Sequence, residues 1–253
     1  MIEITILAVL QGIAEFLPIS SSGHLVLAQN LLKVNAPGMQ LDIFLHLGTL
    51  ISICVFYFSV IKRIVLDFDW RYVAKIIVSA IPAIVVALLF KDRLEQAFDS
   101  TEAVGVALVF TGVVLILTRT MHAGCRDNSF KSALVMGLAQ ALALIPGVSR
   151  SGMTLVGAKA AKVEAVKSAE FSFLMSAPLI VGASLLELIK AFSSSIGAEA
   201  SNMSHLALIY GTLLSGVVGY ASLKILVKTL VSKYFWLFGV YCIVVGVVCV
   251  AVG

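Results

Sequence analysis

Residues 11–24 read QGIAEFLPISSSGH. This stretch breaks an apolar segment, because Gln11 and Glu15 interrupt the run 4–17 and a turn rich in proline, serine and glycine follows it. These residue types favour turns and helix N-caps over a continuous helix. The apolar piece after the turn, 24–32, is too short to cross a bilayer, which needs about 20 residues in a helix. The sequence therefore predicts a re-entrant helical hairpin here.

A second stretch repeats this pattern 129 residues later. Residues 146–154 read PGVSRSGMT, and the short apolar pieces 133–145 and 153–161 flank them. Without a gap, Gln11 aligns with Gln140, and residues 19–23 align with residues 148–152. Non-helical backbone is tolerated at membrane depth only where protein or a water-filled cavity surrounds it. We therefore predict a second re-entrant hairpin.

The composition indicates a membrane protein throughout. Of the 253 residues, 60% are hydrophobic and 13% are charged, about half the charged fraction of a soluble domain. The mean hydropathy of +1.06 agrees. So few charges cannot cover a soluble surface, which excludes a soluble enzyme, a protein that binds nucleic acid and a disordered chain. The apolar residues form long runs, unlike the alternating strands of an outer-membrane barrel.

Six apolar runs approach the length of a membrane span: 43–61, 73–90, 103–118, 171–189, 206–223 and 235–252. We expect an all-α polytopic membrane protein with six transmembrane helices and two re-entrant helical hairpins, forming one membrane domain over 1–253. Each half, 1–122 and 130–253, contains one hairpin and three spans. Because three is odd, the second half inserts upside down. This is an inverted-topology repeat, in which sites lie near the midplane at broken helices.

The basic residues divide unequally between the two predicted faces. Of the 18 lysines and arginines, thirteen fall on one face, four on the other, and Arg150 in a hairpin tip. An excess of basic residues marks the cytoplasmic side. Both termini are therefore predicted outside, with the first hairpin entering from the outside and the second from the cytoplasm. The basic, amphipathic segment 224–233, KILVKTLVSK, is expected at the inner lipid surface.

The first hairpin carries an intramembrane carboxylate, Glu15, which is a functional candidate because burying such a group is costly. Gln11 lies one turn earlier on the same helix face. The serine-rich tip, 20–22, opens a short helix whose free N–H groups, hydroxyls and dipole suit an anion. The alternative for Glu15 is a hydrogen-bonded structural role at the hairpin turn. The alternative for the serine-rich tip is an ordinary N-cap with spare serines. His24 is a nucleophile, a general acid or a satisfied core histidine, and His46 is expected to be structural.

The second tip repeats this chemistry and adds a permanent cation. Arg150 at membrane depth needs an anion, and phosphate matches its planar fork of donors. The alternative is a structural ion pair with Glu15. Thr154, one turn beyond, adds a hydroxyl. Two anion-binding helix N-termini, one with arginine, suit a diphosphate better than a single carboxylate.

Both motifs resemble the two signature motifs of the undecaprenyl-diphosphatase, or bacitracin-resistance, family, and the resemblance covers nearly the whole chain. It implies the fold described above and an integral enzyme of the bacterial cytoplasmic membrane. Such enzymes hydrolyse undecaprenyl diphosphate to undecaprenyl phosphate, recycling the lipid carrier for peptidoglycan synthesis and conferring bacitracin resistance. The implied partners are a polyprenyl diphosphate lipid and membrane lipids. From the charge distribution described above, we expect the active site to open to the outer face.

The resemblance also implies site residues by motif position. The implied catalytic residues are Glu15, Ser21, His24 and Arg150. The implied substrate-binding residues are Gln11, Ser20, Ser22, Ser149, Ser151, Gly152 and Thr154. This sequence departs from the family pattern at position 11, which is often glutamate in the family, because Gln11 cannot act as a base and offers a metal ion less charge. The family's activity is associated with Mg²⁺ or Ca²⁺, which Glu15 and diphosphate oxygens could hold weakly, although the sequence contains no all-protein metal site.

Some alternatives stay open at this point. The nucleophile is Ser21, His24 or a water molecule. An inverted-repeat transporter or lipid flippase is the rival function, and it would need only binding groups, whereas an enzyme needs a nucleophile and a base. The sequence leaves open the oligomeric state, including a homodimer.

Overall fold

The computed structural model describes residues 1–32, 38–98, 100–122, 124–193 and 204–252. Within these ranges the chain is helical and contains no β-strand, as predicted. The first half forms α1 (Ile2–Ala14), α2 (Ser21–Leu32), α3 (Gly38–Phe56), α4 (Phe58–Leu66), α5 (Trp70–Leu89), α6 (Lys91–Phe98), α7 (Thr101–Leu117) and the 3-10 helix η1 (Thr118–Thr120). The second half forms α8 (Phe130–Leu142), α9 (Arg150–Ala160), α10 (Ala165–Ser193), α11 (His205–Val231) and α12 (Leu237–Val252).

The lengths of these helices identify a multi-pass membrane protein. Among the described residues, α5, α7 with η1, α10 and α11 are long and apolar enough to cross a bilayer. A fifth span exists if α3 and α4 are counted together, although the chain bends by 71° between them. The predicted span 43–61 is therefore broken by this bend, and the predicted span 235–252 corresponds to the shorter helix α12, which has 16 residues.

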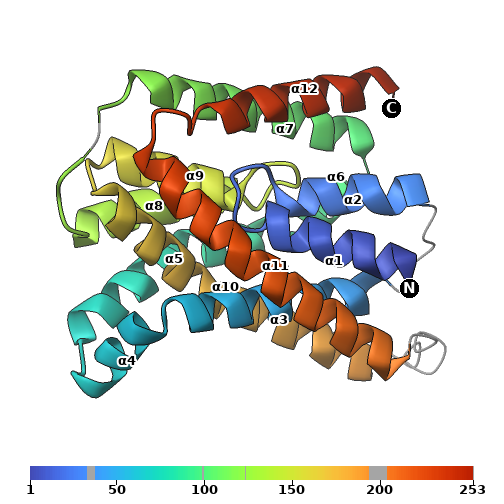
Figure 1. Cartoon of the computed structure of the whole chain (residues 1–253), viewed down its shortest axis with the longest axis horizontal. Coiled ribbons are helices and arrows are strands. Elements are labelled where there is room, and N and C mark those ends of the chain that lie inside the picture. The colour runs from blue at the N-terminus through green and yellow to red at the C-terminus, as the bar shows by residue number, and fades with distance from the viewer. Residues whose placement is uncertain (33–37, 99, 123, 194–203, 253) are drawn as a thin grey trace.

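Figure 1 shows how the two pairs of short helices enter the molecule. The chain termini lie at the same end, and α1 and α2 reach inward from that end (Figure 1). The pair α8 and α9 reaches inward from the opposite end, so the two turns approach each other in the interior (Figure 1). Longer helices surround both pairs, and the turns between short helices are therefore enclosed by protein.

Close backbone contact holds α12 along α7, where Figure 1 shows the two helices side by side. A Cβ atom added to Gly112 of α7 would lie 2.5 Å from the carbonyl oxygen of Gly239 in α12, and one added to Gly239 would lie 2.5 Å from that of Gly112. Gly105 and Gly246 meet in the same way one heptad away. Small residues allow membrane helices to approach this closely.

Aromatic packing beneath the turns fixes the first hairpin against α10. Phe16, in the turn after α1, is fully buried and meets Phe173 of α10 edge-on, with ring centroids 5.4 Å apart. Such pairs add about 0.5–1.5 kcal/mol beyond the area that they bury. The turn that carries Glu15 is therefore held in place by its immediate neighbour in sequence.

Candidate active site

The two turns share a cap hydrogen bond but reverse the chain at different positions. In the first turn the left-handed residue is Ser20, with a φ of 71°, whereas its counterpart Ser149 has a φ of −75° and the left-handed residue of the second turn is Gly147, with a φ of 91°. Ser20 Oγ accepts a 3.3 Å hydrogen bond from the Gly23 amide. At the corresponding position, Ser149 Oγ accepts a 3.1 Å bond from the Gly152 amide. Each serine thus caps the helix that leaves its turn.

The two turns touch each other. Ser151 Oγ donates a 3.1 Å hydrogen bond to the carbonyl oxygen of Leu17 in the first turn. A Cβ atom added to Gly23 would lie 3.1 Å from the Cα of Gly147, and one added to Gly152 would lie 3.3 Å from the Pro18 Cβ. The N-termini of α2 and α9 therefore meet at one place, as expected for an inverted repeat with broken helices near the midplane.

Glu15 lies where the turns meet and collects donors from both. Its carboxylate is 5% exposed. Oε2 accepts a 2.6 Å hydrogen bond from the Ser21 hydroxyl and a 3.1 Å bond from the Gln11 amide. Oε1 accepts from the guanidinium of Arg150. The ion pair considered from sequence is thus formed.

Helix α3 adds two ionisable residues that the sequence analysis did not place in the site. His46 Nε2 lies 3.7 Å from Glu15 Oε2. Its Nδ1 lies 2.7 Å from the backbone carbonyl oxygen of Asp42, so Nδ1 carries a proton and Nε2 is free to accept one. The Asp42 carboxylate accepts a 3.0 Å bond from Gln29. An ionisable pair one turn apart in an apolar run was the available signal.

A cavity of about 460 Å³ opens at this point. Its polar lining comes from the first hairpin, the second hairpin, α3 and α10: Glu15, Ser20, Ser21, Ser22, Asp42, His46, Gln140, Arg150, Ser176 and Ser184. Its remaining lining is apolar and includes Ile43, Leu144, Leu179 and Ile180. A polar end beside an apolar wall suits a molecule with a charged head and a hydrocarbon tail.

Gln140 is a further residue that the sequence analysis left outside the site. It is 2% exposed, and neither its Oε1 nor its Nε2 has a hydrogen-bond partner within the described part of the chain. Gln11, its counterpart in the repeat, also leaves its Oε1 unpaired among the described residues. Buried amides are normally satisfied by protein or water, so an amide without a protein partner on a cavity wall is available to a bound molecule. Its alignment with Gln11 was the sequence signal.

The side chain of His24 points away from this cavity. It is not among the residues that line the cavity. Its Nδ1 lies 2.9 Å from the Ser20 carbonyl oxygen, and its Nε2 lies 2.8 Å from the hydroxyl of Tyr241 in α12. The two rings also stack, with centroids 5.6 Å apart. In this arrangement His24 joins the first hairpin to α12, and its catalytic role stays a prediction.

The remaining predicted substrate-binding residues build the second turn. Ser149, Ser151 and Gly152 make the capping and inter-turn contacts described above, and Thr154 Oγ1 lies 2.6 Å from Ser172 Oγ in α10. Each of these hydroxyls has a protein partner, and none of the four residues lines the cavity. They therefore hold Arg150 in position at the cavity wall.

Known proteins resemble this chain over nearly its whole length. A family model described as bacitracin resistance protein BacA matches residues 4–248. The chain belongs to the bacitracin resistance protein BacA family. Several BacA-family relatives carry the name undecaprenyl-diphosphatase. One from Halothermothrix orenii is 36% identical over 251 residues, covering 97% of this chain and 95% of the relative. One from Desulforapulum autotrophicum is 37% identical over 272 residues, covering 98% and 96%. One from Thermotoga petrophila is 37% identical over 251 residues, covering 98% and 99%.

The donor set at the BacA-family site suits a hard cation only in part. Glu15 and Asp42 offer carboxylate oxygens to the same cavity, and hard cations such as Mg²⁺ and Ca²⁺ prefer oxygen ligands. Both oxygens of Glu15 already accept hydrogen bonds. Among the described residues, no three His, Cys, Asp or Glu side chains gather as a metal site. Any such ion would depend on oxygens that the substrate supplies.

Proposed function

We propose that this protein hydrolyses undecaprenyl diphosphate to undecaprenyl phosphate and inorganic phosphate, recycling the lipid carrier of cell-wall synthesis and conferring bacitracin resistance. One observation carries the chemistry. The Ser21 hydroxyl, the Glu15 carboxylate and the Arg150 guanidinium form a connected set at one end of the cavity. Phosphoryl transfer requires a nucleophile that is hydrogen-bonded to a base, and a cation beside them that can contact the phosphate.

The terminal phosphate of the substrate binds between Arg150 and the N-terminus of α2. Arg150 exchanges its contact with Glu15 for phosphate oxygens, and Gln140 supplies a further donor. Glu15 then accepts the proton of Ser21 while Ser21 Oγ attacks the terminal phosphorus, and the bond to the bridging oxygen breaks. Undecaprenyl phosphate leaves, and water hydrolyses the phosphoserine. Arg150 offsets the charge that spreads over the phosphate oxygens in both transition states.

His46 lies close enough to Glu15 to accept the proton that Glu15 takes from Ser21. Its free Nε2 lies beside the carboxylate that becomes protonated. His46 Nε2 then accepts this proton and returns Glu15 to its ionised form between turnovers. A divalent cation, where bound, would be held by Glu15, Asp42 and diphosphate oxygens, and would add charge stabilisation.

The hydrocarbon tail of the substrate has an apolar path away from the site. A second cavity of about 590 Å³ lies against α7 and the second hairpin, lined by Val106, Phe110, Leu142 and Ile145 among others. It shares Val148 with the catalytic cavity. A polyprenyl chain along this surface would keep the diphosphate in the polar cavity.

We further propose the finer topology expected from the sequence: six spans, two re-entrant hairpins and an inverted repeat in the bacterial cytoplasmic membrane, with both termini outside. The matching cap bonds of Ser20 and Ser149, 129 residues apart, support the repeat. The catalytic hairpin, α1 with α2, reaches inward from the end that holds the termini (Figure 1). The cavity would then open to the outer face.

The test is phosphate release from undecaprenyl diphosphate by the purified protein in detergent, with rapid acid quenching to trap phosphoserine at Ser21. We expect steady release and a labelled Ser21 peptide. Release without a labelled Ser21, together with an inactive Ser21→Ala variant, would assign the attack to a water molecule that Ser21 positions. Absence of release would refute the hydrolase.

The transporter alternative is not favoured, because the relatives carry the name of a phosphatase. A homodimer stays a prediction.

A further inference from the structure

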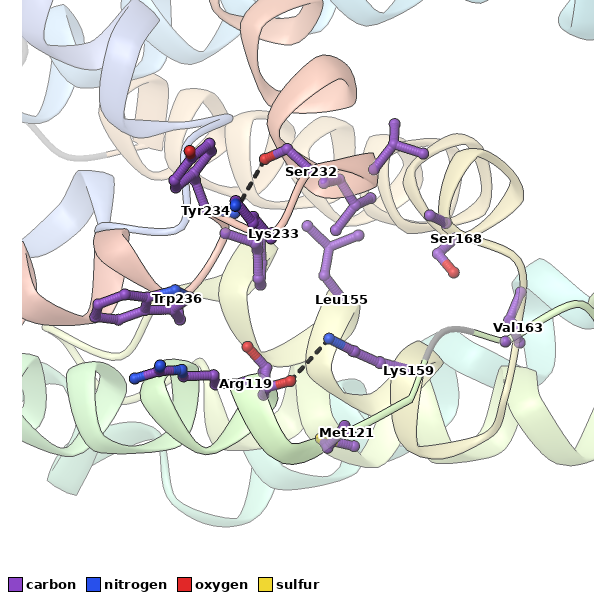
Figure 2. A pocket seen from close by; sticks show the side chains of 16 residues that line it. Arg119, Met121, Leu155, Lys159, Val163, Ser168, Ser232, Lys233, Tyr234 and Trp236 are labelled. Carbon is purple, nitrogen blue, oxygen red and sulfur yellow. Dashed lines mark hydrogen bonds between the residues drawn. The ribbon is translucent and has the colours of Figure 1, made fainter.

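A second polar cavity lies away from the catalytic centre and shares none of its residues. It has a volume of about 600 Å³ and lies among η1, the C-terminal turn of α9 and the connection between α11 and α12. Figure 2 shows its lining from close by, with Arg119, Lys159 and Lys233 together on its walls. No acidic residue lines it within the described part of the chain.

The three cations are not neutralised by the protein. Across the ranges that the structure describes, none of them has a carboxylate within ion-pair distance. Lys159 instead donates a 2.8 Å hydrogen bond to the carbonyl oxygen of Thr118, drawn in Figure 2. Arg119 lies over the ring of Trp236 at 5.0 Å, and Lys233 over that of Tyr234 at 5.5 Å. Three positive charges around one hollow create a strong preference for an anion.

The surroundings of the cavity identify the anion as part of a lipid. Its floor is apolar, with Leu155, Val163 and Phe235 among the lining residues. Beside it runs a groove of about 490 Å³ lined almost wholly by apolar and aromatic side chains, including Leu17, Leu237 and Phe238. Tyr234 lines both hollows. Tyrosine and tryptophan favour the level of the lipid headgroups. A basic hollow joined to an apolar groove matches a phosphate headgroup joined to an acyl chain.

We propose that this cavity, defined by Arg119, Lys159, Lys233 and Trp236, binds the phosphate headgroup of an anionic phospholipid, with an acyl chain in the adjoining groove. It lies toward the end of the molecule opposite the termini, which the charge distribution assigns to the cytoplasmic leaflet. Anionic lipids are enriched in that leaflet and are attracted by basic side chains. The occupied site is separate from the hydrolytic one, so its existence does not depend on the proposed hydrolysis.

The chain offers a built-in reporter for this proposal. Trp236 lines the cavity, and the only other tryptophan in the sequence is Trp70. In the Trp70→Phe variant, reconstituted in vesicles, quenching of Trp236 by phosphatidylglycerol with brominated chains is compared with quenching by brominated phosphatidylcholine. We expect phosphatidylglycerol to quench at a lower mole fraction. Neutralising Arg119, Lys159 and Lys233 to glutamine should reduce this preference by roughly fivefold for each side chain.

A matched control separates a built site from general surface charge. The variant Lys62→Gln/Arg71→Gln/Lys131→Gln removes the same charge from exposed residues outside the cavity, and it should keep the preference. Equal loss in both triple variants, or no loss in the cavity variant, would overturn the proposal. Single variants of the exposed Arg119 and Lys233 serve if the triple variant does not fold. Inorganic phosphate added to vesicles that contain brominated phosphatidylglycerol tests the other source of this anion. Displacement of phosphatidylglycerol by millimolar phosphate would assign the site to the free anion and refute the lipid.

Discussion

At the residue scale, the site is organised around one carboxylate that three donors share. Glu15 accepts hydrogen bonds from Gln11 and Ser21 of its own hairpin and from Arg150 of the other hairpin. Each contact has a different consequence for the chemistry. In the proposed mechanism the serine contact activates a nucleophile, whereas the arginine contact holds the carboxylate until a phosphate competes for the guanidinium.

Replacing Glu15 by glutamine removes the base and keeps the shape of the side chain. We expect kcat to fall by about 10²–10⁴, the usual contribution of a positioned general base. Phosphate release from undecaprenyl diphosphate measures the effect, and Glu3→Gln at the exposed N-terminus is the matched control. A folded Glu15→Gln protein that keeps a near-normal kcat would make Glu15 structural and the mechanism above wrong.

Replacing Arg150 by lysine should not preserve function. Lysine keeps a charge but loses the two parallel donors of the guanidinium and releases its proton more readily when buried. The loss of transition-state stabilisation should be about 2–4 kcal/mol, a factor of roughly 30–1000 in rate. If Arg150 only pairs with Glu15, the variant should instead lose thermal stability, and Arg150→Met/Glu15→Gln should recover it. An active and stable Arg150→Lys enzyme would contradict the proposed phosphate contact.

Gln140 allows function and stability to be separated. Its buried amide has no partner in the described part of the protein, so Gln140→Leu removes an unsatisfied polar group and should leave the melting temperature unchanged or raised. A lost hydrogen bond to a charged phosphate should reduce kcat/KM by roughly 10-fold to 100-fold. Steady-state kinetics and thermal melting of the same preparation measure both. Reduced stability with unchanged kcat/KM would show that Gln140 is a packing residue.

At the element scale, α12 shows how a short helix can be held in a membrane protein. Its length of 16 residues is below that of the four long spans, yet its glycines bring it into backbone contact with α7. It also carries Tyr241, which meets His24 of the first hairpin. The packing of α12 therefore contributes to the position of the catalytic hairpin.

A large side chain at this helix contact should destabilise the protein. In Gly112→Leu the new Cβ alone would lie 2.5 Å from the Gly239 carbonyl oxygen, and overpacking of this kind costs about 1–3 kcal/mol or more. Gly182→Leu in α10 is the matched control, because an added Cβ there meets nothing within 4 Å. Thermal unfolding in detergent measures both variants. Equal melting temperatures would show that α12 does not depend on this contact.

At the scale of the whole molecule, orientation decides which compartment supplies the substrate headgroup. The first hairpin enters from the end that carries both termini (Figure 1), and the basic residues cluster toward the other end. If that basic end faces the cytoplasm, the diphosphate is hydrolysed from the outer leaflet.

Cysteine labelling tests this orientation with an internal reference. Ser22 lines the catalytic cavity, so Ser22→Cys should react with a membrane-impermeant thiol reagent added outside intact spheroplasts. The native Cys125 is exposed on the predicted cytoplasmic side and should react only in inverted vesicles. Removing Cys54, which is also exposed, simplifies the readout. The reverse pattern, with Cys125 labelled from outside, would invert the topology.

The sequence by itself determined the features that depend on neighbouring residues. Hydropathy over a window of one span identified a helical membrane protein, because the cost of placing a polar group in lipid is local to each segment. Turn-forming residues located both breaks, because their conformational preferences are local too. The two motifs also contain Glu15, Ser21 and Arg150, so most of the proposed catalytic cluster was predictable.

Only the tertiary structure decided which distant side chains meet. Arg150 reaches Glu15 across 135 positions, and His24 meets Tyr241 across 217. Hydropathy does not specify how a helix is rotated about its axis, so it could not show that His24 turns away from the cavity while His46 and Gln140 face it. The bend between α3 and α4 and the basic cavity around Trp236 likewise follow from packing among segments far apart in the chain. The free energy of such contacts depends on all the segments that form them, and no single stretch of sequence contains it.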